Sequence, residues 1–266
     1  MTSSNSTGRD AGALGGSLRR GIAGRRCLVT GASRGLGRTI ATRLAEQGGK
    51  VALLARQSVD LSAAGSEIGR AAMVVPCDVS DPRAVDDAVS HIASTWDGID
   101  AVINNAAIVN LLRLEAASDD EIARELSVNL LGPIYVSRAT IPHLRAAGGG
   151  DLMFISSEAV RMPFPYLTLY GASKGGLEVL ATGLRSELRE QGTRVTVVRS
   201  GSIADTDIQR DWEPEIKADF FGACKRAGLG AFTGTPASRD SIALAVLQML
   251  SLPMDVNVDL IEARGR

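Results

Sequence analysis

Short apolar segments alternate with longer segments of helical periodicity along most of the chain, and this alternation constrains the fold more than any other feature. The expected strands lie near residues 26–30, 50–55, 72–76, 100–104, 151–156, 194–199 and 256–261. The expected helices lie near residues 35–47, 61–70, 82–95, 118–146, 170–190 and 237–251. Strands that are apolar throughout and joined by helices predict a parallel sheet covered on both faces. We therefore predict an α/β fold: a single doubly wound Rossmann-type domain with about seven parallel strands.

Length and composition predict one domain that spans residues 24–266. The chain has 266 residues, of which 45% are hydrophobic, and no linker or repeat interrupts it. Residues 1–23 are rich in Ser, Gly and Arg, and we expect them to form a disordered N-terminal arm. This arm holds no block apolar enough for a signal peptide or a membrane span. Its basic residues Arg9, Arg19 and Arg20 leave an amphipathic targeting sequence open as an alternative.

Charge and cysteine content indicate a cytoplasmic protein. The net charge is −1, with acidic and basic residues interspersed, so no electrostatic footprint points to nucleic acid or to an anionic membrane. The three cysteines, Cys27, Cys77 and Cys224, form no C-x-x-C pair, and we expect buried thiols in a reducing compartment. The two histidines, His91 and His143, have no partners at ligand spacing, so no metal site is predicted.

The eight residues Thr30-Gly31-Ala32-Ser33-Arg34-Gly35-Leu36-Gly37 lie between an expected strand and an expected helix. Gly31 permits a tight turn, Gly35 allows a pyrophosphate to approach the backbone, and Gly37 allows close packing of the helix on its strand. The N–H groups and the dipole of the helix start then face the phosphates. Taken alone, the three glycines are equally compatible with an ordinary strand-to-helix turn.

The end of the second expected strand indicates which dinucleotide would fit. An acidic residue about 20 positions after the glycines would bind the ribose 2′-hydroxyl of NAD. Here the strand ends in Ala55-Arg56-Gln57, and Arg56 together with Arg34 could hold a 2′-phosphate by charge-assisted hydrogen bonds. This favours NADP(H). Two alternatives remain: both arginines could be solvated loop residues, or Asp60, slightly farther along, could be the NAD-type acid.

Tyr170 and Lys174 are four residues apart within an expected helix and so share one helix face. An ammonium group beside the phenol favours the phenolate, and we expect it to lower the pKa of Tyr170 toward the range of an acid/base catalyst. Tyrosine could then exchange a proton with a carbonyl or alcohol oxygen while hydride moves to or from a nicotinamide. On its own, the pair could also be a surface feature.

Together these residues resemble the classical short-chain dehydrogenase/reductase family, and the resemblance covers about residues 24–262. The motifs that carry it are TGASRGLG at 30–37, Asp78-Val79 after the third strand, Asn104-Asn105-Ala106-Ala107 after the fourth, Asn129, Ser157 in Ile155-Ser156-Ser157, and the Tyr170/Lys174 pair. The resemblance implies that Asp78 and Val79 contact adenine and that Asn105 and Ala106 belong to the cofactor site.

The resemblance also implies a task for each catalytic residue. Tyr170 would be the general acid/base, and Ser157 would donate a hydrogen bond to the reacting oxygen. Lys174 would bias the pKa of Tyr170 and bind the nicotinamide ribose, while Asn129 would connect it to solvent through water. Singly, Ser157 could be a strand-end hydroxyl bonded to the backbone, and Asn129 a locally bonded polar residue of a helix.

Two positions depart from the family pattern. Ser200-Gly201 stands where the family usually has Pro-Gly, which removes a rigid turn residue. Ile203 and Thr206 still match the nicotinamide contacts that follow, although Thr206 lies one position later than in the commonest form. Ala107 replaces the last glycine of the N-N-A-G motif and adds a methyl group at a close backbone approach.

The substrate site is expected between the loop after Ser157 and the segment 200–236, which has no strand signal and is long enough to be a lid. The apolar and aromatic residues of these segments are Met162, Phe164, Pro165, Tyr166, Trp212, Phe220, Phe221 and Phe232. One hypothesis is a pocket for a mainly apolar ketone or secondary alcohol. The alternative is that the aromatic residues only fix the lid to the core or to a neighbouring subunit. Lys217, Lys225 and Arg226 could bind an acidic tail of the substrate, but acidic residues lie among them. We therefore expect these residues to form a solvated helix face.

Two further features have structural interpretations. Ser118, followed by Asp119, Asp120 and Glu121, is the expected start of a helix rather than a catalytic acidic cluster. Apolar stripes mark two of the flanking helices, at Leu126, Val128, Leu130, Leu131 and Val136 and at Leu177, Val179, Leu180 and Leu184. The stripes fit burial against the sheet. The resemblance implies in addition that these helices pair across a two-fold axis, which gives a homodimer or homotetramer.

These observations favour an NADP(H)-dependent oxidoreductase, a carbonyl reductase or alcohol dehydrogenase acting on a small-molecule substrate. The first alternative is an NADP-binding sensor or scaffold without turnover. The presence of all four expected catalytic residues, Asn129, Ser157, Tyr170 and Lys174, favours the enzyme over this alternative. A second alternative lies within the same family: an epimerase, a dehydratase or a biosynthetic tailoring enzyme.

Overall fold

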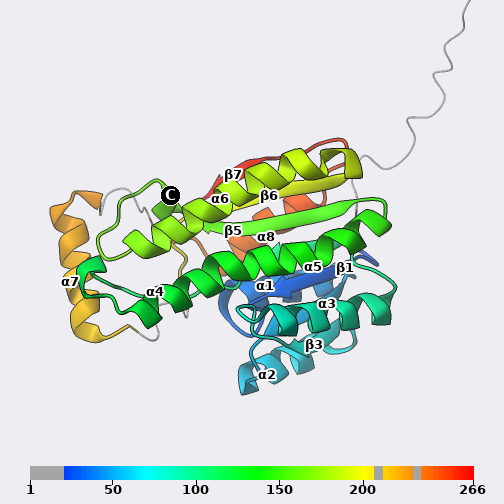
Figure 1. Cartoon of the computed structure of the whole chain (residues 1–266), viewed down its shortest axis with the longest axis horizontal. Coiled ribbons are helices and arrows are strands. Elements are labelled where there is room, and N and C mark those ends of the chain that lie inside the picture. Colours follow the sequence, from blue (N-terminus) through cyan, green and yellow to red (C-terminus); the bar gives the residue numbers. More distant parts are fainter. Residues whose placement is uncertain (1–20, 207–211, 230–234) are drawn as a thin grey trace, which may run out of the picture.

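Seven parallel strands form one sheet at the centre of the molecule, as the sequence predicts (Figure 1). The computed structural model describes residues 21–206, 212–229 and 235–266. The strands are β1 Arg26–Thr30, β2 Lys50–Ala55, β3 Ala72–Pro76, β4 Ala101–Asn104, β5 Gly150–Ser157, β6 Thr193–Ser200 and β7 Leu260–Ala263. Their order in the sheet is β3-β2-β1-β4-β5-β6-β7, with every neighbouring pair parallel. The chain reverses its direction across the sheet between β1 and β4, where such folds bind ligands.

Helices cover both faces of this sheet, so the fold has three layers. One face carries α1 Gly35–Glu46, α2 Val59–Ile68 and α8 Arg239–Leu250. The other face carries α3 Pro82–Trp96, α5 Gly132–Ala146 and α6 Thr168–Leu188. The helices α4 Asp119–Leu126 and α7 Pro214–Arg226 lie beyond the carboxyl ends of the strands, and Figure 1 shows them at the same end of the molecule.

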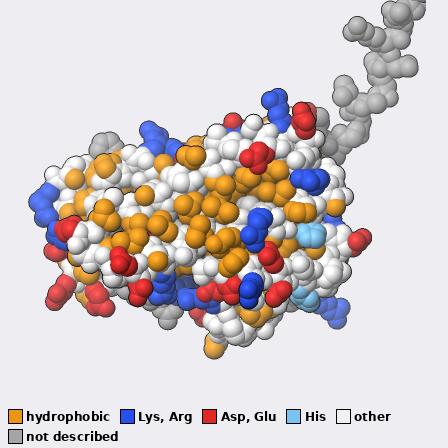
Figure 2. All heavy atoms as spheres, in the orientation of Figure 1, with side chains coloured by type: hydrophobic (Ala, Val, Ile, Leu, Met, Phe, Trp, Pro, Cys, Tyr) orange, Lys and Arg blue, Asp and Glu red, His pale blue; other side chains and the backbone are white. Residues whose placement is uncertain are grey.

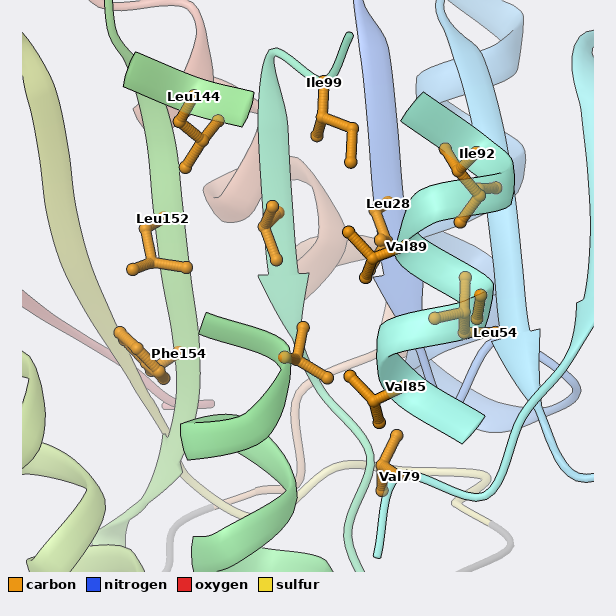
Figure 3. Packing of buried hydrophobic residues seen from close by; sticks show 14 of the residues in the cluster. Leu28, Leu54, Val79, Val85, Val89, Ile92, Ile99, Leu144, Leu152 and Phe154 are labelled. Atoms are coloured by element: carbon orange, nitrogen blue, oxygen red, sulfur yellow. The ribbon is translucent and has the colours of Figure 1, made fainter. Parts of the chain in front are cut away.

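A continuous apolar core fills the space between the sheet and each helical layer. On the α3 side, Leu28 and Phe154 from the sheet face Val89 and Ile92 from α3 and Leu144 from α5 (Figure 3). All five side chains are buried. Because both faces of every central strand are covered, the strands are apolar throughout, which is why the sequence shows runs rather than alternation.

Ser118 begins α4 with a capping box, as expected. Its hydroxyl accepts a hydrogen bond from Glu121 N, and the Glu121 carboxylate accepts one from Ser118 N at 2.9 Å. The acidic run Asp119, Asp120 and Glu121 forms the first turn of the helix. Cys27, Cys77 and Cys224 are buried thiols outside any disulfide, also as expected.

The structure departs from the expected elements in three places. The helix expected at 118–146 contains a π-helical turn, Ser127–Leu131, between α4 and α5. The last strand begins at Leu260 rather than near 256, because a turn closes at Val256 N with Pro253 O, and strand pairing with β6 starts only at Leu260. The segment 200–236, which has no strand signal, contains the helix α7.

Packing begins before the expected domain boundary. Ile22 is 3% exposed and belongs to the apolar core on the α1 side, whereas the arm was expected to extend to residue 23. An apolar side chain that packs under α1 belongs to the domain rather than to an arm. Residues 1–20 of the expected arm, with Arg9, Arg19 and Arg20, lie outside the described residues, as does Phe232. Among the described residues, no helix has the length and the apolar composition needed to cross a membrane.

Candidate active site

The fold brings the expected site residues together at one edge of the sheet. In parallel strands all carboxyl ends lie at the same edge, so the loops that follow the strands are neighbours there. The expected residues follow six strands: Gly31, Ser33, Arg34, Gly35, Leu36 and Gly37 after β1, Arg56 after β2, Asp78 and Val79 after β3, Asn105 and Ala106 after β4, Ser157 at the end of β5, and Ile203 and Thr206 after β6. Tyr170 and Lys174 lie on α6, and Asn129 lies in the π-helical turn.

The three glycines differ in their surroundings. A Cβ at Gly37 would lie 2.3 Å from Gly31 O and 2.4 Å from Asn105 Nδ2, so only glycine fits this approach of helix to turn. Gly31 has a φ of +66°, and a Cβ there would lie 2.8 Å from Ala106 Cα. Gly35 has a φ of +56°, but no atom lies within 4 Å of its Cβ position. The loop is therefore tightly packed behind Gly31 and Gly37 and open at Gly35, at the start of α1.

The start of α1 has the features of an anion site. Arg34 caps the helix with its backbone only, and the first turn contains no acidic residue. The amide groups of this turn and the helix dipole thus face the open side of Gly35, and no acidic residue of the turn itself neutralises them. Ala32 N donates to Leu54 O at 3.2 Å, which ties the loop to β2.

Arg56 and Asp78 lie side by side after β2 and β3. Asp78 Oδ1 accepts hydrogen bonds from Ser80 N and Ser80 Oγ at 3.0 and 2.7 Å. Partial burial raises the pKa of Asp78, but the Ser80 bonds and the charges of Arg56 and Arg124 outweigh it and hold the pKa below its ordinary value. Asp78 is thus a fixed anion, and exposed Arg56 lies close enough to act on it.

Asp60 lies in the first turn of α2, behind the capping residue Ser58, whose hydroxyl accepts from Leu61 N at 3.1 Å. An acidic residue in the first turn stabilises a helix through the dipole. The place of Asp60 in the first turn of α2 gives it this structural role at the helix start.

Asn105 joins the glycine loop to β4. Its backbone N donates to Thr30 Oγ1 at 2.9 Å, and its Nδ2 donates to Thr30 O at 2.9 Å. Ala106 N donates to the same Thr30 hydroxyl at 3.0 Å. Thr30 therefore connects the loop after β1 to the loop after β4, at the point where the order of the strands reverses. The sequence did not reveal this role.

Ser157, Tyr170 and Lys174 form a buried cluster between β5 and α6. The Ser157 hydroxyl is in hydrogen-bonding contact with the Tyr170 phenol, and it also accepts from Ala159 N at 3.2 Å. Lys174 Nζ lies 5.8 Å from the centroid of the Tyr170 ring and donates to Ile155 O at 2.9 Å. The exposed fractions of Tyr170 and Lys174 are 8% and 3%.

The pKa expected for Tyr170 is wrong in direction. Burial of the phenol raises the pKa of Tyr170 to about 12, and the Ser157 hydrogen bond offsets only part of this increase. Burial also lowers the pKa of Lys174 to about 8. The ammonium lies over the ring and is bonded to Ile155 O, so it does not overcome the desolvation of the phenol. In this state Tyr170 holds its proton throughout the neutral range.

Asn129 holds the loop after β4 in place. Its Oδ1 accepts from Ile108 N at 2.9 Å, and its Nδ2 donates to Ile108 O at 2.8 Å and to Ser173 Oγ at 3.3 Å. The side chain therefore satisfies both backbone polar groups of Ile108 and connects that loop to α6. Its own backbone lies in the π-helical turn, a feature that is frequent at functional sites.

Ser200 keeps the turn after β6 in register without proline. It pairs with Ser157 in the sheet, its hydroxyl donates to Gly201 O at 3.0 Å, and Gly201 N donates to Ala263 O at 2.9 Å. Ile203 then forms a parallel bridge with Ala237. These contacts fix the segment that leads to Thr206.

The aromatic residues of the expected lid pack mainly on one another. Phe164 and Phe220 are 9% and 8% exposed, and the Trp212 ring meets Phe220 edge to face with centroids 5.9 Å apart. Trp212 Nε1 also donates to Val109 O at 2.7 Å. Met162 and Tyr166 pack against the same cluster, whereas Phe221 is exposed. This arrangement favours the alternative in which the aromatic residues fix the segment to the core.

Glu125 is the main site residue that the sequence did not reveal. It is fully buried on α4, where its Oε2 accepts from Asn110 Nδ2 at 2.9 Å. A signal was present: Ile122, Glu125, Leu126 and Asn129 follow the spacing of one helix face, and an acidic residue stands where an apolar one is expected.

Comparisons with known proteins identify the family of the chain. The sequence profile of short chain dehydrogenases matches residues 25–217, and the chain belongs to this family. It is 29% identical over 236 residues to the NADP-dependent 3-hydroxy acid dehydrogenase YdfG of Salmonella typhi, covering 88% of this chain and 92% of the relative.

Solved structures give the same assignment. A short chain dehydrogenase from Burkholderia cenocepacia J2315, in complex with NADP, superposes with a TM-score of 0.79 at 32% identity, covering 92% of this chain and 98% of the other. A closed form of serine dehydrogenase complexed with NADP+ gives a TM-score of 0.79 at 26% identity, covering 90% and 94%.

Proposed function

We propose that the protein is an NADP(H)-dependent oxidoreductase that interconverts a ketone or aldehyde and an alcohol by hydride transfer. The observation that carries the proposal is the cluster of Ser157, Tyr170 and Lys174, which lies at the same edge of the sheet as the glycine loop. Similarity to NADP-dependent relatives and to structures that contain NADP supports the choice of cofactor.

The residues of the site fit this cofactor. The open space at Gly35 and the start of α1, where the N-cap residue makes no side-chain capping bond, suit a pyrophosphate, which would be held by backbone N–H groups. Arg34 and Arg56 would hold the 2′-phosphate, and Asp78 and Val79 would contact the adenine. Asn105, Ala106, Lys174, Ile203 and Thr206 would border the ribose and the nicotinamide. When bound, NADPH supplies the hydride that is transferred to the carbonyl carbon.

In the direction of reduction, Tyr170 would donate its proton to the carbonyl oxygen as the oxygen gains negative charge. The raised pKa of Tyr170 suits this step, because the phenol is protonated at neutral pH before reaction. The Ser157 hydroxyl would donate a hydrogen bond to the same oxygen and stabilise its charge. Lys174 and Asn129 would then support the return of a proton to Tyr170.

For the substrate class, we propose small 3-hydroxy acids and the corresponding oxo acids. The aromatic residues that could have lined an apolar pocket are engaged with one another. A cationic side chain connects the loops after β4 and β5. The guanidinium of Arg113, in the first loop, donates to Tyr166 Oη, in the second, at 2.5 Å. It also lies over the Tyr166 ring, 4.8 Å from the ring centroid. It could bind a substrate carboxylate. The similarity to a 3-hydroxy acid dehydrogenase supports the same class.

The assay is NADP+ reduction at 340 nm with a panel of 3-hydroxy acids and apolar secondary alcohols, using the wild type and Tyr170→Phe. We expect turnover of the acids, lost in Tyr170→Phe and weakened by Arg113→Ala through a higher KM. Turnover that persists in Tyr170→Phe would overturn the mechanism. NADPH binding without Tyr170-dependent turnover on any substrate would favour a sensor or scaffold, while a product other than the oxo acid would favour the epimerase, dehydratase or tailoring alternatives.

We also propose that the protein assembles as a homodimer or homotetramer through α5 and α6. Figure 2 shows hydrophobic side chains gathered over the face that these helices form. Val179 of α6 is 73% exposed and Leu131 of the π-helical turn is 38% exposed, whereas Val136 and Leu177 of the same stripes are buried in the core. A sedimentation mass equal to that of the monomer would contradict the assembly.

A further inference from the structure

A buried carboxyl group next to the catalytic cluster has no role in the proposed mechanism. Glu125 is 0% exposed, and its Oε2 accepts hydrogen bonds from Asn110 Nδ2 at 2.9 Å and from Asn110 N at 3.4 Å. Within the described part of the chain, its Oε1 has no hydrogen-bond partner. A buried acidic group with one unpartnered oxygen destabilises a fold unless another interaction compensates.

That interaction is with α6. Helix α4, which carries Glu125, packs against α6, which carries Tyr170 and Lys174. In the part of the chain that the structure describes, these two are the titratable groups that interact with Glu125 from the packed elements, and its loop neighbour Asn110 is uncharged. Burial raises the pKa of Glu125, whereas the Asn110 bonds and Lys174 act to lower it. In return, the Glu125 charge acts to raise the pKa of Lys174 and of Tyr170.

We propose that Glu125 is a positioning residue that provides the buried counter-charge of Lys174 and so keeps the lysine protonated beside Tyr170. Lys174 is 3% exposed, and among the described residues its ammonium donates to one neutral acceptor, Ile155 O. A buried ammonium in such surroundings loses its proton readily unless an anion is near. Within the described residues, Glu125 is the acidic group that acts on Lys174.

The Asn110 amide fixes the orientation of the Glu125 carboxylate. Its two hydrogen bonds hold one carboxylate oxygen of Glu125 and leave the other without a protein donor. The carboxylate is thus fixed in direction between the loop after β4 and α6. The proposal rests on the proposed function, because a protonated Lys174 matters only if Tyr170 and Lys174 act in catalysis.

The test observes Lys174 directly and needs no substrate. The chain has four lysines, Lys50, Lys174, Lys217 and Lys225, so the ε-carbon resonances of lysine-labelled protein can be followed by NMR as the pH is raised. Lys174 has a pKa lowered by burial to about 8, while solvated lysines titrate near about 10.4. The resonance that is missing in Lys174→Arg gives the assignment.

In Glu125→Gln, which keeps the shape of the side chain and an acceptor for Asn110, we expect the Lys174 midpoint to fall by about one pH unit. Glu125→Met removes the charge with an apolar side chain of similar length, a change that buried sites often tolerate, and it should give the same shift. The matched control is Asp120→Asn, which removes an exposed carboxylate from the same helix and should leave the midpoint unchanged.

A Lys174 midpoint that is the same in Glu125→Gln and Glu125→Met as in the wild type overturns the proposal. With a substrate in hand, the alkaline limb of the pH–kcat profile should move to lower pH in both variants, whereas a merely structural role would lower kcat at every pH. If no Tyr170-dependent turnover exists, the proposed function fails while the NMR result still decides whether Glu125 and Lys174 are coupled.

Discussion

Substitution of Gly37 by alanine tests whether the glycine loop is built as the structure shows. A Cβ at this position would lie 2.3 Å from Gly31 O, 2.4 Å from Asn105 Nδ2 and 2.9 Å from Gly31 C. Two of these atoms belong to the backbone of a turn that is itself packed on Ala106, so the turn cannot yield without moving the loop after β4. Overpacking of this kind costs about 1–3 kcal/mol.

We expect Gly37→Ala to lower the free energy of unfolding by that amount, measured by urea denaturation. In thermal unfolding the corresponding decrease in Tm is about 2–4 °C per kcal/mol for a chain of this size. The displaced turn should also weaken NADPH binding, measured by fluorescence titration, by about tenfold or more, which corresponds to about 1.4 kcal/mol or more.

The control is Gly183→Ala. Gly183 lies within α6, and no atom lies within 4 Å of its Cβ position. This variant should be more stable than the wild type by about 0.5–1 kcal/mol, with unchanged NADPH binding. A Gly37→Ala variant with wild-type stability and wild-type NADPH affinity would refute the account of the loop.

Three further predictions concern charge and chemistry. Arg56→Ala should weaken NADPH binding by about 10–100-fold and leave NADH binding unchanged, because only NADPH carries the 2′-phosphate; an equal loss for both in parallel titrations would contradict this role. Asp100→Asn should cost about 2 kcal/mol in urea unfolding at pH 7, because Asp100 accepts from Arg26 N, Nε and Nη2 at 2.8, 2.9 and 2.7 Å. Burial raises the pKa of Asp100, but the Arg26 bonds outweigh it and hold the pKa below its ordinary value. The wild type therefore loses this stabilisation as the pH falls and Asp100 is protonated. The difference in unfolding free energy between the wild type and Asp100→Asn should shrink below about pH 4 and should not grow. Tyr170→Phe should retain NADPH binding within about twofold while losing turnover, because in the proposed mechanism the phenol hydroxyl acts on the substrate, and Tyr170 is only one of the many residues expected to contact the cofactor.

Most of the fold could be predicted because both faces of the sheet are covered. Doubly buried strands such as β1 and β5 appear in the sequence as continuous apolar runs, and Ser118 with Glu121 marks the start of α4. The start of β7 was predicted too early, since its position depends on a turn at Pro253 and on pairing with β6 rather than on local composition.

The sequence predicted which of the candidate residues lie together at the carboxyl edge of the sheet, but not their electrostatics. Strand ends place Arg56 and Asp78 side by side, and helical spacing places Tyr170 near Lys174. Spacing does not give burial, however, and burial sets the direction of the Tyr170 pKa. Glu125 was missed for a related reason: a residue on α4 becomes part of the site only because α4 packs on α6. The π-helical turn at Asn129 also has no signal in composition.

The proposed function is decided by comparing the wild type with Tyr170→Phe in two assays on the same preparations: titration with NADPH and NADH, and NADP+ reduction at 340 nm with 3-hydroxy acids. We predict that both proteins bind NADPH in preference to NADH and that only the wild type turns over. Equal turnover by Tyr170→Phe, or a preference for NADH, would contradict it.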